Sequence, residues 1–177
     1  MVFYADTSAL VKLVVAEPET RRLRSWISQT SPTLVSSDLT RTELLRAARR
    51  TAPDQIVQAR AVLDSLILIT PSPATFEAAA FLDPAILRSL DALHLATALE
   101  LGDDLDGFVC YNQRLAEAAK ACQRRGLAPW LSIRMNDMHG ATRMPEASWM
   151  NCELFKDPSM RLRGMTNNPK EPFSITW

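Results

Sequence analysis

The sequence predicts an α/β fold in which a central parallel sheet is packed between helices. Short apolar segments recur along the chain as far as Arg125, and longer segments with helical character separate them. The first of these segments, 2–5, is apolar throughout and ends at Asp6. Continuously apolar strands are typical of a parallel sheet covered on both faces. The alternation of strands with helices supplies the crossovers that parallel pairing requires.

Four strands and seven helices are expected in this part of the chain. The strands are expected at residues 2–5, 33–36, 66–69 and 107–111, and the helices at 7–15, 17–27, 37–50, 53–65, 74–82, 89–101 and 113–125. Pro53 suits the first turn of its helix, and Pro71 and Pro73 stop the strand before them. A last strand at 127–133 would lie at the edge of the sheet, because Pro129 has no backbone N–H to donate.

Composition and charge favour a single-domain protein without a disulfide framework or a membrane span. The chain has 177 residues, of which 47% are hydrophobic, enough for the core of one domain. Its 20 basic and 20 acidic side chains cancel, so contact with nucleic acid would depend on a local basic patch and would be sensitive to salt. Its three cysteines match no zinc spacing and imply no disulfide framework. Without a signal-peptide pattern or an apolar run of about 20 residues, we expect a cytoplasmic protein with no membrane span.

The character of the sequence changes near Gly126. Six of the seven methionines and three of the four tryptophans lie beyond this point, and neither helical nor strand periodicity persists there. We therefore divide the chain into a domain at 1–128 and an atypical C-terminal extension at 129–177. The extension is expected to be irregular and poorly ordered.

Three acidic residues stand where a ligand site is expected. Asp6 follows the first strand, and the ligands of open α/β sheets gather at the carboxyl ends of strands. Glu43 lies at the edge of the apolar arc of the helix at 37–50. Asp91 opens the helix at 89–101, which is apolar nearly all round and therefore buried. Carboxylates gathered in a partly buried site require a cation to neutralise them, which favours a metal site.

Each acid also has a purely structural explanation. Asp6 is suited to cap the helix that follows it, and Asp91 to interact with the dipole of its own helix. Glu43 is suited to pair on the surface with Arg46 or Arg50, which lie on the same helix. The residues alone leave both explanations open.

Three further residues require a similar choice. His94 lies on the same apolar helix as Asp91 and is expected to be a buried core histidine rather than a ligand or a catalytic base. Asn112 is typical of a helix N-cap, yet its place between a strand and a helix is equivalent to that of Asp6. Cys110 lies within an apolar run and is expected to be a buried thiol.

Four short runs, in this order along the chain, resemble one protein family. They are YADTSAL from Tyr4, RTEL from Arg41, SLDALHLATA from Ser89 and YNQRL from Tyr111. Each run alone is weak evidence. The ordered set with its spacing resembles the PIN-domain endoribonucleases, and among them the VapC toxins of type II VapBC toxin–antitoxin pairs. The resemblance extends from residue 1 to about residue 128 and implies an α/β/α sandwich with a central parallel sheet.

The resemblance implies a metal-dependent ribonuclease. It implies that Asp6, Glu43 and Asp91 bind Mg²⁺ or Mn²⁺ and catalyse the hydrolysis of RNA, as the preference of Mg²⁺ for carboxylate oxygens allows. It also implies a homodimer and a cognate antitoxin of the VapB type. The residues expected to support the site are Thr7, Ser8 and Asn112. The candidates for contact with RNA phosphates, each near one of the acids in sequence, are Arg41, Arg46, Arg88 and Arg114.

The chain departs from the family pattern at two positions. Asn112 stands where the family usually has aspartate, and Cys110 where threonine is common. An asparagine removes one negative charge, so a second cation would bind more weakly and activity would be reduced or lost. The alternative to an active ribonuclease is therefore a weakened or inactive PIN-domain protein that still binds its antitoxin. A phosphatase with Asp6 as nucleophile is disfavoured, because position 8 holds serine instead of a second acid.

Overall fold

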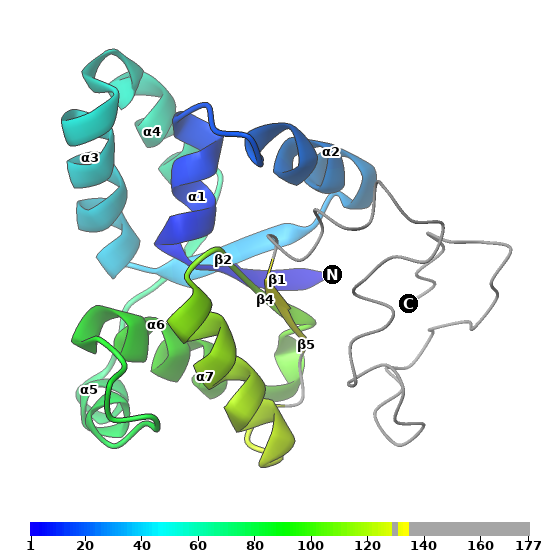
Figure 1. Cartoon of the computed structure of the whole chain (residues 1–177), viewed down its shortest axis with the longest axis vertical. Helices are drawn as coiled ribbons and strands as arrows, with labels where there is room; N and C mark the ends of the chain where they lie inside the picture. The colour runs from blue at the N-terminus through cyan, green and yellow to red at the C-terminus, as the bar shows by residue number, and fades with distance from the viewer. Residues whose placement is uncertain (129–130, 135–177) are drawn as a thin grey trace, which may run out of the picture. The chain divides into compact units, whose positions relative to one another are not determined.

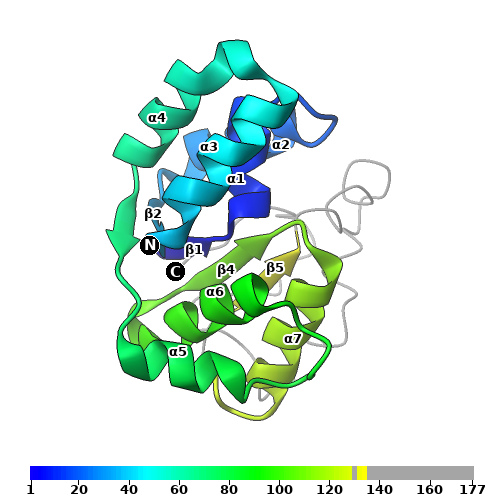
Figure 2. The same cartoon turned by 90° about the vertical axis from the view of Figure 1, so that its left-hand side faces the viewer.

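The computed structural model describes residues 1–128 and a strand at 131–134. Apart from that strand, the extension expected to be irregular at 129–177 lies outside the described residues. The described chain forms a five-stranded sheet between two layers of helices (Figure 1). Helices α1 to α4 cover one face and α5 to α7 cover the other, as the turned view in Figure 2 also shows. The predicted α/β/α sandwich is therefore confirmed.

The elements alternate along the chain as the sequence predicts. The strands are β1 (Val2–Ala5), β2 (Thr33–Ser37), β3 (Ile67–Ile69), β4 (Gly107–Cys110) and β5 (Leu131–Arg134). The helices are α1 (Thr7–Val14), α2 (Thr20–Thr30), α3 (Leu39–Thr51), α4 (Ile56–Asp64), α5 (Pro73–Ala80), α6 (Ser89–Glu100) and α7 (Gln113–Arg124). Short 3₁₀ turns occupy Pro53–Gln55 and Gly102–Asp104.

The order of the strands creates a switch point in the middle of the sheet. All described pairings are parallel, and the order is β3-β2-β1-β4-β5. The chain leaves β1 toward one edge through β2 and β3, and then returns to the other side of β1 as β4 and β5. In open α/β sheets, ligands bind beyond the carboxyl ends of the strands at such a point. A ligand site is therefore expected at the residues that follow Ala5 and Cys110, the last residues of β1 and β4.

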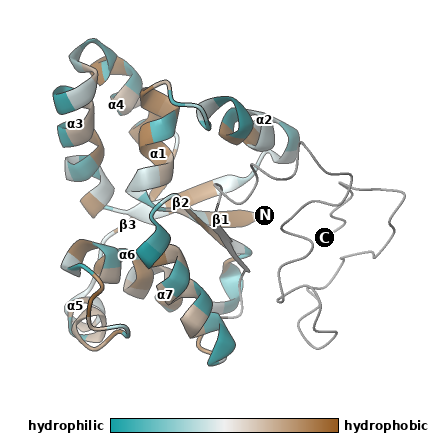
Figure 3. Cartoon of the chain, in the orientation of Figure 1, coloured by the Kyte–Doolittle hydropathy of each residue, from teal (hydrophilic) through white to brown (hydrophobic). Residues whose placement is uncertain are grey.

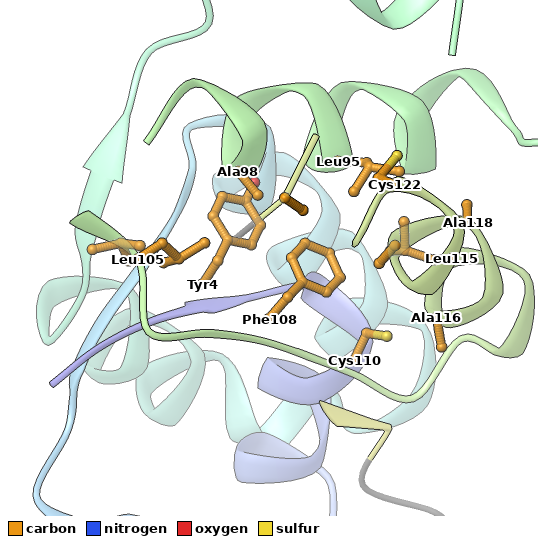
Figure 4. Close-up of a cluster of buried hydrophobic side chains, with 13 residues drawn as sticks. Tyr4, Leu95, Ala98, Leu105, Phe108, Cys110, Leu115, Ala116, Ala118 and Cys122 are labelled. Atoms are coloured by element: carbon orange, nitrogen blue, oxygen red, sulfur yellow. The ribbon is translucent and has the colours of Figure 1, made fainter. Parts of the chain in front are cut away.

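Each face of the sheet has its own hydrophobic core. One cluster packs α1, α3 and α4 on the sheet, and another packs α6 and α7. Figure 4 shows Tyr4 and Phe108 side by side in the second cluster, where their rings stack with centroids 5.3 Å apart. Figure 3 shows hydrophobic and hydrophilic residues together on α1, α3 and α7. The two cores fix the central strands, and with them the loops that carry the site.

The boundaries differ most at the last strand, expected at 127–133 and found as β5, and next at α2. The helix was expected at 17–27 but begins at Thr20, because the segment before it is held as a turn. The hydroxyl of Thr20 donates to the carbonyl of Lys12 (2.8 Å) and accepts from the N–H of Glu17 (2.9 Å). The Lys12 ammonium in turn bonds to the carboxylates of Glu17 and Glu19. No helix in the described part of the chain is long and apolar enough to cross a membrane.

Candidate active site

Asp6 lies directly after β1, at the switch point of the sheet, and only 4% of it is exposed. Its backbone N–H donates to the carbonyl of Val109 (3.0 Å), which continues the pairing of β1 with β4. Its Oδ2 accepts a hydrogen bond from the N–H of Ser8 (2.9 Å) and so caps α1. The other oxygen, Oδ1, lies 3.8 Å from Nε2 of His94. Capping therefore uses one oxygen of Asp6 and leaves the second facing the site.

Glu43 reaches the same place from α3. Its Oε2 accepts hydrogen bonds from Oγ1 of Thr7 (2.6 Å) and Nε2 of His94 (2.7 Å), rather than from an arginine on its own helix. Burial raises the pKa of Glu43, but the hydrogen bonds from His94 and Thr7 outweigh burial and hold the pKa below its ordinary value. The expectation of a surface pair with Arg46 or Arg50 is therefore wrong.

Asp91 stands in the first turn of α6 with one oxygen unused. Its Oδ2 is buried and has no hydrogen-bond partner among the described residues. Burial is the main cause that raises the pKa of Asp91, and the charge of Asp6 adds to it, while Asn112 and Arg114 act in the opposite direction. A buried carboxylate oxygen without a donor, beside a second carboxylate, is an arrangement that a cation would stabilise.

The three residues expected to support the site are placed around these acids. Thr7 bonds to Glu43, as described above, and the hydroxyl of Ser8 accepts from the N–H of Tyr111 (2.8 Å), which ties α1 to the end of β4. Asn112 caps α7, since its Oδ1 accepts from the N–H of Arg114 (3.1 Å). Its side chain also lies close enough to Asp91 to lower the pKa of that carboxyl.

His94 is both the buried histidine that the sequence predicts and a neighbour of the acids. Only 1% of it is exposed, and its Nδ1 lies 2.8 Å from the hydroxyl of Tyr4. Burial lowers the pKa of His94, but Glu43 and Asp6 raise it more, so the pKa lies above its ordinary value. His94 was not predicted from the sequence to belong to the site. Its spacing of three residues from Asp91 on one helix was the signal that could have done so.

The four candidate arginines differ in the contacts that the structure records for them. Arg114 is close enough to lower the pKa of Asp91 through its charge. Arg41 is exposed and pairs with Asp38 (Nε to Oδ1, 3.0 Å). Arg46 and Arg88 are exposed, on α3 and just before α6. Arg114 is exposed like the other three, but it is the one whose charge acts on Asp91.

The acids do not form a ready-made cage of three ligands. Within the described residues, no group of three or more His, Cys, Asp and Glu side chains is arranged to hold a metal ion. Oε2 of Glu43 is instead bonded to Thr7 and His94, whereas Asp6 and Asp91 are close enough for the charge of Asp6 to raise the pKa of Asp91. This pair suits Mg²⁺, which is usually bound by one or two carboxylates and keeps several waters.

Comparison with known proteins identifies the class to which this fold and these acids belong. The family model of the PIN domain matches residues 3–125. Ribonuclease VapC47 of Mycobacterium tuberculosis (strain CDC 1551 / Oshkosh) is 41% identical over 123 residues, which cover 67% of this chain and 90% of the relative. Ribonuclease VapC46 of Mycobacterium tuberculosis (strain ATCC 25618 / H37Rv) is 40% identical over 126 residues, 71% of this chain and 96% of the relative. The chain therefore belongs to the PIN domain family, and within it to the group of the VapC ribonucleases.

Two solved structures share the fold. The crystal structure of Mycobacterium tuberculosis VapC20, described as a sarcin–ricin loop cleaving toxin, has a TM-score of 0.55 at 15% identity and covers 66% of this chain and 94% of that one. A toxin–antitoxin complex from Klebsiella pneumoniae has a TM-score of 0.50 at 23% identity and covers 63% of this chain and 87% of that one. At these identities the similarity concerns the fold alone.

Proposed function

We propose that this protein is a metal-dependent endoribonuclease and the toxin of a toxin–antitoxin pair. The observation that carries the proposal is the buried, unpartnered Oδ2 of Asp91 beside Asp6, at the switch point of the sheet. Membership of the PIN domain family supplies the reaction class, since the relatives at about 40% identity are ribonucleases. Activity accounts better for two carboxylates held together in a partly buried site than a purely structural role does.

The proposed chemistry is hydrolysis of a phosphodiester bond. A divalent cation at this site, Mg²⁺ or Mn²⁺, would activate water and stabilise the charge that develops on the phosphate. Asp6 and Asp91 would hold it, with Glu43 as the third acid. Thr7 orients Glu43, and Ser8 fixes the start of α1 against the end of β4. Arg114 neutralises part of the acidic charge and, with Arg41, Arg46 and Arg88, is proposed to contact RNA phosphates.

Asn112 is proposed to limit this activity. Its side chain is neutral and its Oδ1 caps α7, so this corner of the site offers a cation no charge and only the second lone pair of one amide oxygen. A second cation would therefore bind weakly, while the pair of Asp6 and Asp91 remains available to a first one. This favours a ribonuclease of reduced activity over an inactive one.

The direct test is the metal dependence of RNA cleavage by the purified full chain. We expect single-stranded RNA to be cut with Mg²⁺ or Mn²⁺, to stay intact with EDTA, and to be cut again when excess Mg²⁺ is restored. The products should carry 5′-phosphate and 3′-hydroxyl ends, which end-labelling distinguishes. A preparation of Asp6→Asn, purified in parallel, controls for contaminating ribonuclease. Cleavage that persists in EDTA, or that the Asp6→Asn preparation shows equally, would contradict the proposal.

The proposed partners are a cognate antitoxin and a second copy of the chain. A complex with an antitoxin is proposed because the Klebsiella pneumoniae neighbour is a toxin–antitoxin complex of the same fold. The homodimer is supported by exposed large apolar side chains concentrated between residues 76 and 90. They are Phe76 (50% exposed), Phe81 (87%), Ile86 (74%) and Leu90 (46%). Such concentrations of exposed apolar side chains are typical of protein interfaces.

Charged substitutions in this segment test the homodimer. Phe81→Glu combined with Ile86→Glu is expected to convert a dimer into a monomer, because both side chains are exposed and apolar. Sedimentation velocity measures the mass. The melting temperature should change little, since neither residue belongs to a hydrophobic core. A native chain that sediments as a monomer at all concentrations would refute the homodimer.

A further inference from the structure

A hydrogen-bonded chain of side chains runs from the core into the site. The hydroxyl of Tyr4 on β1 lies 2.8 Å from Nδ1 of His94 on α6, and Nε2 of His94 lies 2.7 Å from Oε2 of Glu43 on α3. Tyr4 and His94 are both almost completely buried, and Glu43 is a quarter exposed. Since a carboxylate oxygen accepts, Nε2 of His94 is the donor to Glu43.

The surroundings of His94 leave it little freedom to turn. Nδ1 is occupied by Tyr4, whose own ring stacks on Phe108 and meets the imidazole edge-on with centroids 6.0 Å apart. On the other side, Nε2 lies 3.4 Å from Oγ1 of Thr7 and 3.8 Å from Oδ1 of Asp6, both farther than Glu43. Glu43 is therefore the residue to which His94 is directed.

A second buried chain holds the same oxygen of Glu43. Thr7 donates to Oε2 and lies 3.2 Å from the hydroxyl of Thr40, which in turn lies 2.7 Å from the hydroxyl of Ser36. Ser36 donates to the carbonyl of Ala5 (2.7 Å). Both hydrogen bonds described for Glu43 thus end on Oε2, which leaves Oε1 to meet a ligand.

We infer that His94 is a positioning residue that anchors Oε2 of Glu43, so that Oε1 is presented to the cation beside Asp6 and Asp91. The inference rests on the proposed function, because it assigns His94 a role through an acid of the same site. Hydrogen bonds to a carboxylate ligand fix its direction, and their loss weakens metal binding. Nothing in this role requires His94 to bind the cation or to transfer a proton.

Two substitutions of His94 separate positioning from packing. In His94→Gln the side-chain amide reaches about as far as Nε2 and keeps a donor for Glu43. In His94→Asn the amide reaches only as far as Nδ1 and keeps a partner for Tyr4. We measure Mn²⁺ binding to the full chain by electron paramagnetic resonance, without RNA, and check the fold of each variant by circular dichroism. His94→Asn is expected to weaken Mn²⁺ binding roughly 10- to 100-fold, and His94→Gln to restore most of it.

A double substitution shows whether the effect passes through Glu43. In a Glu43→Gln background, His94→Asn is expected to cause no further loss of Mn²⁺ affinity, because the carboxylate that His94 positions is already gone. If His94→Asn does not fold, Tyr4→Phe serves in its place, since it removes the hydroxyl that fixes the ring and keeps the stacked aromatic ring. Tyr4→Phe should weaken Mn²⁺ binding in the same direction.

The outcomes that overturn the inference differ from those that overturn the proposed function. Native Mn²⁺ affinity in His94→Asn, equal losses in the Asn and Gln variants, or a full additional loss in the Glu43→Gln background would each refute positioning by His94. So would a Glu43→Gln variant with native affinity. A chain that binds Mn²⁺ with the expected order of variants but leaves RNA intact would refute the ribonuclease and retain the role of His94.

Discussion

Asp91→Asn is expected to lower the rate of RNA cleavage by at least about a hundredfold, because it removes one of the two carboxylates that we propose to hold the cation. The same substitution should leave the fold intact. Burial and the charge of Asp6 raise the pKa of Asp91, which means that its charged form is disfavoured in the folded chain. A neutral asparagine relieves that repulsion, so the melting temperature without metal should be unchanged or higher.

The measurements for Asp91→Asn are initial cleavage rates over a range of Mg²⁺ concentrations, together with thermal melting in EDTA. Asn112→Asp is the matched change of opposite sign, since it adds a carboxylate next to Asp91 and keeps a side chain that caps α7. It should lower the Mg²⁺ concentration needed for half-maximal cleavage by about tenfold. Native cleavage by Asp91→Asn would show that the reaction takes place elsewhere.

Phe108→Ala is expected to lower the free energy of unfolding by about 3–5 kcal/mol, the usual range when a large buried aromatic side chain is truncated. Phe108 is completely buried in β4 and stacks on Tyr4 in the cluster shown in Figure 4. Its removal leaves a cavity beneath α6, the helix that carries Asp91 and His94. Urea unfolding followed by circular dichroism measures the change.

An exposed position provides the control for Phe108. Val57→Ala on α4, where 79% of the side chain is exposed, should change the free energy of unfolding by no more than about 0.5 kcal/mol. If Phe108→Ala has the same midpoint of urea unfolding as the native chain, the stacked pair of Phe108 and Tyr4 does not stabilise the core as expected. Since Tyr4 also bonds to His94, the Phe108→Ala variant should bind Mn²⁺ more weakly than Val57→Ala at temperatures where both are folded.

Local patterns in the sequence determined the alternation of strands and helices. The short apolar runs and the proline and glycine positions place every strand and helix of the described chain within a few residues of its predicted bounds. The later start of α2 has a tertiary cause. Thr20 and Lys12 hold the preceding turn through side-chain contacts, which helical periodicity does not reveal. Asp6 and Asn112 were predictable as strand-end residues for the same local reason, and both cap the helices that follow them.

Only the tertiary structure decided which of these polar groups meet. Glu43 and His94 are 51 residues apart, and Tyr4 and His94 are 90 apart, so no periodicity within one helix pairs them. Their contact depends on the strand order, which places β1 and β4 side by side, and on the packing of α3 and α6 around the site. The sequence by itself determined that Asp6, Asp91 and Asn112 lie at the starts of helices and that Glu43 lies at the edge of the apolar face of its helix. Packing decided that Glu43 is hydrogen-bonded to His94, that Asn112 lies close enough to Asp91 to lower its pKa, and that one oxygen of Asp91 stays unpaired. The two differ because a local sequence pattern specifies the face of a helix or strand on which a side chain lies. The partners of that side chain depend on the distances between elements, which packing sets.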